Sequence, residues 1–184
     1  MGYFYSLGVN FNERELAEKC NQKVKNFEIK LTDDSIVEVE TYVYEEKLIN
    51  GKFRYQSQIF PKGMQCSTGN RKLLSKPYFY EIRNKIYSFF FFFFMEFNYA
   101  FYEFEGADYF LDEDVVEQIN KFGIGTTEKD KNASFMGFFN VDYYLPKRHL
   151  DGLILSERMF SNVEDKNSFV EFKNKYMWLP FDYK

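Results

Sequence analysis

Few side chains in this sequence could act as a base or a nucleophile. His149 is the single histidine of the chain, and histidine most simply supplies a base near neutral pH. It follows Lys147 and Arg148, which is typical of a solvated loop. A Ser-His-Asp or Cys-His arrangement would depend wholly on a histidine that we expect at the surface. The sequence therefore favours a protein that is not an enzyme.

The two cysteines, Cys20 and Cys66, are too far apart in the sequence to form a close-spaced metal pair. They also do not make a disulfide framework, so we expect free thiols in a reducing cytosol. Neither has neighbours typical of a nucleophile. The sequence leaves open a single bridge between them, and a functional role for either.

One group of carboxylates could do more. Glu103 and Glu105 point to the same side of an expected strand, and Asp108 follows shortly after. Two acids on one face can divide acid and base roles, which with His149 gives the alternative of a carboxylate/His enzyme. With Tyr109 the same acids form an acidic–aromatic rim suited to a basic protein. We predict a partner-binding site at Glu103, Glu105, Asp108 and Tyr109.

No pattern indicates a metal or a cofactor. The sequence has no Cys-x-x-Cys pair, no histidine cluster, no EF-hand loop and no glycine-rich phosphate loop. The acidic run Asp112-Glu113-Asp114 stands where a helix is expected to begin, and acids there complement the helix dipole. We expect no metal site and no cofactor.

Composition limits the partners. The chain has 184 residues and a net charge of −4, which suits one domain and disfavours direct nucleic-acid binding. The first residues do not resemble a secretory signal, and the apolar run Phe89–Met95 is too short to cross a membrane. We expect a cytoplasmic protein that binds neither nucleic acid nor membrane. The sequence leaves homo-oligomerisation open.

The N-terminal half alternates between helix and strand signals. Asn12 and Glu15 resemble a capping box, which predicts a helix that ends near Lys25. Alternating apolar residues predict strands on either side of it, and Asn50-Gly51 predicts a hairpin. The expected strands cover residues 3–9, 27–31, 37–43 and 53–59.

Six consecutive phenylalanines, Phe89–Phe94, form the densest aromatic segment of the chain. The run has no polar face, so it is typical of a central strand or a buried helix, and β-propensity favours the strand. We expect nearly all of these rings to be buried, because burial of each large aromatic contributes about 2 kcal/mol or more.

The last third repeats one local pattern: a short apolar strand, a capping Asp or Ser, and an acidic first helical turn. It occurs at residues 109–119 and again at 153–160. Gly123 is expected to end the first of these helices. The predicted fold class is α+β: a single domain over residues 1–184 with a mostly antiparallel, aromatic-rich central sheet and about three helices.

The segments FEGADYFLDEDVVEQI and HLDGLILSERMFSNV, followed by Trp178-Leu179-Pro180, resemble immunity proteins of bacterial polymorphic toxin systems, and among them the immunity-43-like set. The shared feature is an apolar-Ser-Glu-Arg junction between a strand and a helix, here Leu153–Met159. The resemblance implies a non-enzymatic cytoplasmic protein that binds and neutralises a cognate, basic protein toxin. It brings no catalytic residues. The alternatives are an assembly protein that uses the aromatic sheet as a subunit interface, and the carboxylate/His enzyme.

Overall fold

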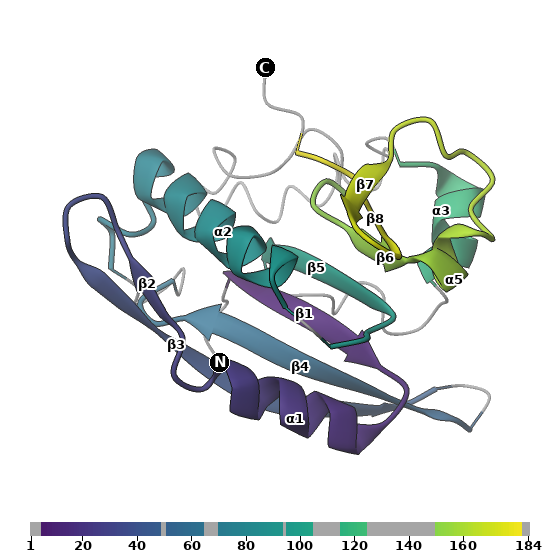
Figure 1. Ribbon diagram of the computed structural model, residues 1–184, viewed down its shortest axis with the longest axis horizontal. Coiled ribbons are helices and arrows are strands. Elements are labelled where there is room, and N and C mark those ends of the chain that lie inside the picture. Colours follow the sequence, from purple (N-terminus) through teal and green to yellow (C-terminus); the bar gives the residue numbers. More distant parts are fainter. Residues whose placement is uncertain are drawn as a thin grey trace. The chain divides into compact units, whose positions relative to one another are not determined.

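The computed structural model describes residues 5–48, 51–64, 70–93, 95–104, 115–124 and 150–181. The chain falls into two compact units, Met1–Asp112 and Glu113–Lys184, which are described in turn. Both combine helices with antiparallel strands (Figure 1), which confirms the predicted α+β class. The described residues form four helices, one more than the three or so expected. A single domain over residues 1–184 stays a prediction.

The first unit is built on five antiparallel strands in the order β2-β3-β4-β1-β5. The hairpin between β3 and β4 forms where Asn50-Gly51 predicted it. Gly51 has a φ of +79°, and the Leu48 N–H donates to the Lys52 carbonyl oxygen at 2.7 Å. The strands are β1 (Tyr5–Phe11), β2 (Glu28–Lys30), β3 (Ile36–Lys47), β4 (Phe53–Pro61) and β5 (Tyr99–Phe104).

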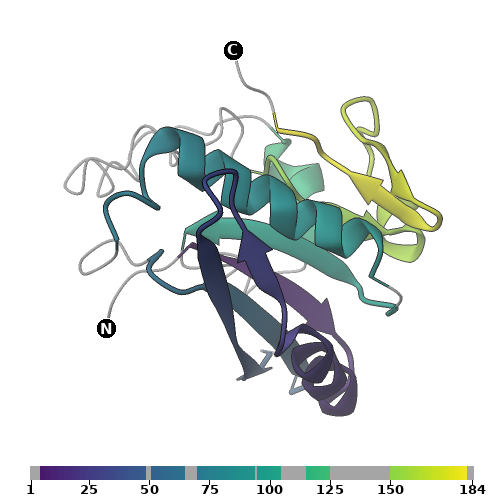
Figure 2. The ribbon, with the colours of Figure 1, turned by 60° about the vertical axis from the view of Figure 1, so that its left-hand side comes forward.

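Both helices of this unit, α1 (Arg14–Val24) and α2 (Lys76–Phe91), pack on the same face of the sheet. Phe79 of α2 meets the ring of Tyr5 edge-on, with ring centroids 4.6 Å apart. Ser57 of β4 shares this face, because β1 places Val9 opposite it, and its hydroxyl donates to Asn21 of α1. Figure 2 shows α2 lying along β5. We call this side the helix face and the opposite side the amide face.

Helix α1 confirms the first predicted helix but not its cap. The cap residue is Glu13, without a side-chain hydrogen bond to the helix. Asn12 instead accepts a hydrogen bond from Asn98 Nδ2 at 2.9 Å, which ties the start of α1 to the residues before β5. The buried residues of α1 are Ala17, Cys20 and Val24.

The predicted strand at the phenylalanine run is wrong. Phe89–Phe91 are the last residues of α2, and Phe92 follows as the helix cap. The buried residues Phe79, Ile82, Ile86, Phe90 and Phe93 recur every three or four positions, which is the period of a helix. Pro77 in the first turn is also typical of a helix start. The side-chain period of α2 overrides the β-propensity of phenylalanine.

Burial of the six phenylalanines is also incomplete. Phe90 and Phe93 are buried and stack with ring centroids 4.8 Å apart, and Phe89 stacks on Phe27 at 4.2 Å. Phe91 and Phe92 are 47% and 68% exposed. Consecutive side chains of a helix point to different sides of its axis. Some rings of the run therefore face outward whichever side of the helix is covered.

The second unit has the helices α3 (Val115–Phe122) and α5 (Glu157–Phe160). Gly123 ends α3 with a φ of +72°, and its N–H donates to the Ile119 carbonyl oxygen at 2.8 Å, as predicted for a C-terminal glycine. Asn120 of α3 donates to the Asn162 carbonyl oxygen at 2.9 Å. The strands are β6 (Ile154–Ser156), β7 (Val170–Lys173) and β8 (Tyr176–Trp178), with β8 paired antiparallel to both others.

Candidate functional site

The predicted partner-binding residues lie mostly beyond the described part of the chain. Glu103 is in β5, where its backbone lies opposite Ser6 of β1. Glu105, Asp108 and Tyr109 are outside the described residues. The acidic–aromatic rim that they would form therefore stays a prediction.

The same holds for His149, Cys66 and the acidic run 112–114, all of which lie outside the described residues. Cys20 is described: it is a free, fully buried thiol on the inner side of α1. Burial raises the pKa of this thiol to about 11, which disfavours the reactive thiolate. Cys20 is part of the packing under α1.

An acidic–aromatic surface does occur in the first unit, on β3. Glu38, Glu40, Tyr42, Tyr44 and Glu46 alternate along this strand, so their side chains point to the amide face. We call these five residues the acid–tyrosine row. Tyr42 and Tyr44 are 46% and 39% exposed, and Tyr42 also contacts Phe60 with ring centroids 5.4 Å apart. The row thus has two partly exposed tyrosine rings in its middle, with Glu38 and Glu40 on one side of them and Glu46 on the other.

Two cations balance part of the charge in the row. Lys62 Nζ lies 2.6 Å from Glu38 Oε2 and 3.4 Å from Glu40 Oε1, so these three groups keep one net negative charge. The hydrogen bond from Lys62 lowers the pKa of Glu38. Glu46 pairs with Arg54 at 2.7 Å, and both side chains are mostly buried. Each acid of the row therefore has a cation within ion-pair distance.

The amide face beside the row is polar although it is buried. The register places Tyr44 opposite Gln56, and Gln56 opposite Asn10. Gln56 is 2% exposed, and neither its Oε1 nor its Nε2 has a hydrogen-bond partner. Asn10 accepts a hydrogen bond from Asn98 Nδ2 at 2.9 Å, but its own Nδ2 has no partner. An unpartnered buried amide costs stability, about 1–3 kcal/mol.

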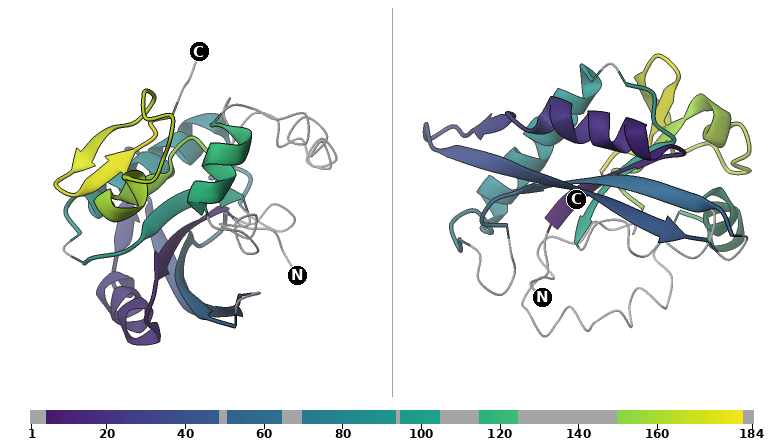
Figure 3. Two further views of the ribbon diagram at one scale, coloured as in Figure 1. Left: turned by 90° about the vertical axis from the view of Figure 1, so that its right-hand side faces the viewer. Right: turned by 90° about the horizontal axis from the view of Figure 1, so that it is seen from below.

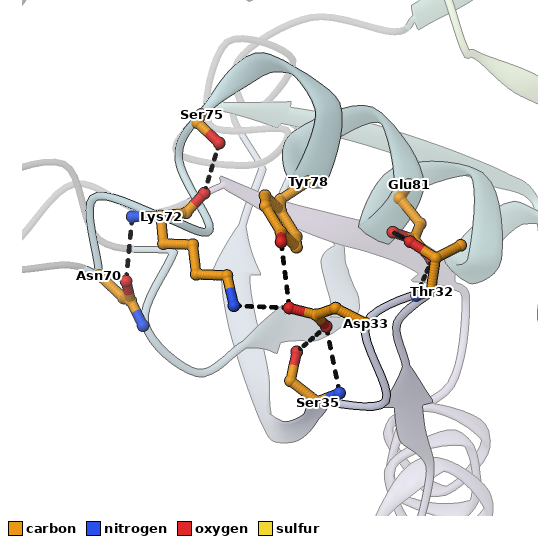
Figure 4. Close-up of polar contacts among 8 residues, drawn as sticks. All are labelled: Thr32, Asp33, Ser35, Asn70, Lys72, Ser75, Tyr78 and Glu81. Carbon is orange, nitrogen blue, oxygen red and sulfur yellow. Dashed lines mark hydrogen bonds and ion pairs between the residues drawn. The ribbon is translucent and has the colours of Figure 1, made fainter.

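A second polar cluster joins the turn after β2 to α2 (Figure 4). Asp33 accepts hydrogen bonds from Lys72 Nζ at 2.5 Å, Ser35 Oγ at 2.5 Å and the Tyr78 hydroxyl at 3.0 Å. These donors hold the pKa of Asp33 well below its ordinary value, with Lys72 the largest cause. The carboxylate is saturated by its own chain. The cluster serves to anchor the turn, not to bind a ligand.

Thr32 and Glu81 extend the same anchor. The Thr32 backbone N–H donates to Glu81 Oε1 at 2.7 Å, and its hydroxyl donates to Oε2 at 3.0 Å (Figure 4). The two contacts fix the beginning of β3 against α2. They position the strand that carries the acid–tyrosine row.

Outside the acid–tyrosine row, the described residues of the first unit expose large apolar side chains at three places. Phe91 and Phe92, at the end of α2, lie edge-to-face with ring centroids 5.2 Å apart. Ile36, at the start of β3, is 56% exposed, and Phe53, at the start of β4 beside the hairpin turn, is 46% exposed. None of these places combines rings with charge as the acid–tyrosine row does.

The described residues contain no group of three or more His, Cys, Asp or Glu side chains that could hold a metal ion. None of the described helices is both long and apolar enough to cross a membrane. No family model, curated protein or solved structure matches this sequence. The site must therefore be interpreted from its own geometry.

The row was visible in the sequence as an alternation of Val37, Val39, Thr41 and Val43 with glutamates and tyrosines. That alternation predicted a strand with one face turned outward. Acids beside tyrosines also occur at residues 103–109, so this combination alone does not single out β3. The signal that distinguishes β3 is the length over which the alternation persists.

Proposed function

We propose that this protein is a non-enzymatic cytoplasmic binding protein that neutralises a basic protein toxin, in the manner of bacterial immunity proteins. The observation that carries the proposal is the acid–tyrosine row, with two adjacent half-exposed tyrosines between carboxylates. Tyrosine is enriched among residues that dominate binding energy at protein interfaces. The net charge of −4 and the resemblance of the C-terminal half to immunity proteins support the same proposal.

The row suits a basic partner for two separate reasons. Its carboxylates raise the rate of encounter with a positively charged surface. The rings of Tyr42 and Tyr44 offer contact area and can lie under a Lys or Arg side chain. Because the row sits on a paired strand, its backbone loses little freedom on binding.

The test is protection of a host from the toxin. The candidate partner is the product of a gene that lies directly upstream, expressed under a separate inducible promoter. We expect the wild-type protein to restore growth and to bind that product. The double variant Tyr42→Ala/Tyr44→Ala should lose about 2 kcal/mol of binding free energy, roughly 30-fold in Kd.

A matched pair of charge variants distinguishes the effect of the acids in the row from the effect of the protein's net charge. Glu38→Lys/Glu40→Lys should slow association and flatten its dependence on salt. Glu164→Lys/Glu171→Lys makes the same change in charge at exposed positions of the second unit and should bind like wild type. Equal binding by both double variants would contradict the proposal, as would the failure of wild type to protect.

A second function is favoured by one observation, the exposed pair Phe91 and Phe92. Exposed adjacent rings are typical of a subunit interface, so an assembly protein is the alternative. It would use the end of α2 rather than the sheet. Sedimentation over a wide concentration range distinguishes the two: self-association abolished by Phe92→Lys supports assembly, and a constant monomer rejects it.

The enzyme alternative has no support among the described residues. It depends on His149 and on acids at 103–108, of which only the backbone of Glu103 is described. No described geometry brings a base to a nucleophile. The proposal of a binding protein therefore stands ahead of it.

A further inference from the structure

Strand β3 is much longer than its partner on one side. β2 pairs only with Ile36–Glu38, whereas β4 pairs with β3 from Val39 to Lys47. Within the described part of the chain, no strand pairs with Val39–Lys47 on the β2 side. We call this stretch the open edge. Its nine residues extend over about 26 Å, the length of an ordinary strand or more.

Two backbone hydrogen bonds show which backbone groups of the open edge point outward. The Lys62 N–H donates to the Glu38 carbonyl oxygen at 2.8 Å, and the Leu48 N–H donates to the Lys52 carbonyl oxygen at 2.7 Å. Hydrogen-bonded pairs alternate along an antiparallel ladder, so the even-numbered residues from Glu38 to Leu48 face β4. The odd-numbered residues direct both N–H and C=O away from β4. They are Val39, Thr41, Val43, Glu45 and Lys47.

The open edge is protected by charge and by few other features. Proteins block edge strands with charged side chains, prolines, bulges or a covering element, and here Glu40, Glu45 and Glu46 oppose pairing with another acidic strand. Val39–Lys47 contains no proline, its register with β4 is continuous, and Lys47 is its one lysine. α1 contacts β1 and β4 as well as β3, so it lies across the helix face and not along the edge (Figure 3). Among the described strands none occupies this edge, which leaves it open to an added strand as far as the described residues extend.

The side chains beside the open edge select the chemistry of that strand. An added strand places every second side chain on the amide face, next to Glu40, Tyr42 and Tyr44. Carboxylates and tyrosine rings both attract Lys and Arg. Glu38 and Glu40 share a single lysine, Lys62, which leaves negative charge for an incoming cation.

We propose that the open edge of β3 accepts an extended segment of a partner protein as an additional strand, with Lys or Arg at alternate positions against the acid–tyrosine row. Backbone hydrogen bonds to the odd-numbered residues would supply affinity, and the row would supply specificity. The identity of the partner as a toxin rests on the proposed function. The mode of binding rests on the edge alone.

A second copy of the chain is a poorer occupant. Residues 38–47 carry four glutamates and one lysine, so two copies of the strand side by side would repel each other. A basic segment meets the same charges with attraction. Self-pairing is therefore an outcome that the experiment must be able to report.

The test uses the full protein and a defined probe, the peptide acetyl-Lys-Val-Arg-Val-Lys-Thr-Arg-amide. Residue-resolved hydrogen exchange by NMR is measured with and without saturating peptide. We expect exchange of the odd-numbered amides Thr41, Val43 and Glu45 to slow about tenfold or more. The even-numbered amides Tyr42 and Tyr44 already donate to β4, so their exchange should change little. This odd–even pattern is specific to strand addition.

Three controls make the proposal falsifiable. The same peptide with N-methylated backbone at alternate residues keeps its charges but cannot pair, and it should bind at least about tenfold more weakly. A peptide with Glu in place of each Lys and Arg should not bind. Val43→Pro removes one outward N–H and should weaken binding, whereas Glu171→Lys, in the other unit, should not.

The proposal is rejected if the basic peptide does not bind, or if the N-methylated peptide binds with equal affinity. It is also rejected if odd and even amides are protected equally, or if the odd amides become protected in the absence of peptide as the protein concentration rises, which indicates self-pairing. Failure of this proposal can be told apart from failure of the proposed function. Toxin neutralisation without the odd–even pattern rejects strand addition, and peptide binding without toxin neutralisation rejects the function.

Discussion

Two segments of the first unit, α2 and β3, are both rich in aromatic residues and use them in opposite ways. The rings of Phe79 and Phe90 in α2, and of Phe93 just after it, are buried. In β3 the rings of Tyr42 and Tyr44 are about half exposed and stand between carboxylates. The two segments differ in the spacing of their aromatic residues and in the hydroxyl group that tyrosine has and phenylalanine lacks. Positions three and four apart make one face of a helix, and positions two apart make one face of a strand.

The comparison shows that aromatic density alone does not identify the core. Phe91 and Phe92 belong to the densest aromatic run of the chain and yet are 47% and 68% exposed. A ring is buried where the period of its element points it at another layer. The hydroxyl of tyrosine makes exposure less costly than for phenylalanine, which agrees with the exposure of Tyr42 and Tyr44.

The largest expected effect is a difference in the free energy of unfolding between a variant in α2 and a variant in β3. Phe90→Ala removes a buried ring that stacks on Phe93 at 4.8 Å, and should lower the free energy of unfolding by about 3–5 kcal/mol. Tyr44→Ala removes an exposed ring and should change it by less than about 0.5 kcal/mol. Urea denaturation of both variants measures the difference.

Phe92→Ala is the matched control within the phenylalanine run. It deletes the same ring from a position that is 68% exposed, so its effect on unfolding should resemble that of Tyr44→Ala. Equal destabilisation by Phe90→Ala and Phe92→Ala would mean that the position of a ring along the helix does not determine its burial. The contrast between buried rings in α2 and exposed rings in β3 would then be wrong.

Much of the fold of the first unit could be predicted from local patterns. The strands, the hairpin at Asn50-Gly51 and the helix at 14–24 each follow from side-chain period or turn chemistry. The helix α2 could not be predicted with β-propensity as the guide, because six identical residues hide any period. The period becomes visible only when Phe79, Ile82 and Ile86 are counted together with Phe90.

The candidate site was harder to predict for a physical reason. Sequence shows which side chains share a face of a strand, but not which edge of that strand lacks a neighbour. The open edge depends on β2 being three residues long and β3 being twelve. The buried amides of Asn10 and Gln56 likewise depend on which strands become neighbours. Pairing between distant segments sets both features.

The second effect concerns Gln56, the buried amide beside the acid–tyrosine row. Gln56→Met keeps the length of the side chain and removes two buried polar atoms that have no partner. We expect it to raise the free energy of unfolding by about 1 kcal/mol, because the desolvation cost of the amide is lost. Thermal denaturation reports the change.

Ser57→Ala provides the contrast of opposite sign. The Ser57 hydroxyl donates to Asn21 across the helix face, and its removal leaves the Asn21 oxygen without that donor. We expect a loss of about 1 kcal/mol. If Gln56→Met destabilises the protein as Ser57→Ala does, the amide of Gln56 is hydrogen-bonded in solution, and its burial beside the row has no desolvation cost.

The smallest effect tests the polar cluster that joins the two segments. Asp33, which precedes β3, binds Lys72 in the turn before α2 and Tyr78 in the first turn of α2. The pKa of Asp33 is lowered in the folded protein, chiefly by Lys72. Its stabilising contribution is therefore present above the ordinary carboxyl pKa of 3.8 and is lost as pH falls below that value. The Asp33→Asn variant lacks this titration. We expect wild type to exceed it in stability near neutral pH.

That difference should shrink as the pH falls from about 6 to about 2, measured by urea denaturation at each pH. It should also shrink in a Lys72→Met background, where the main cause of the lowered pKa is gone. High salt should reduce it further, since the pair is partly exposed. A difference that is constant with pH would show that the charge of Asp33 does not hold β3 to α2. The row would then owe its position to the register with β4 alone.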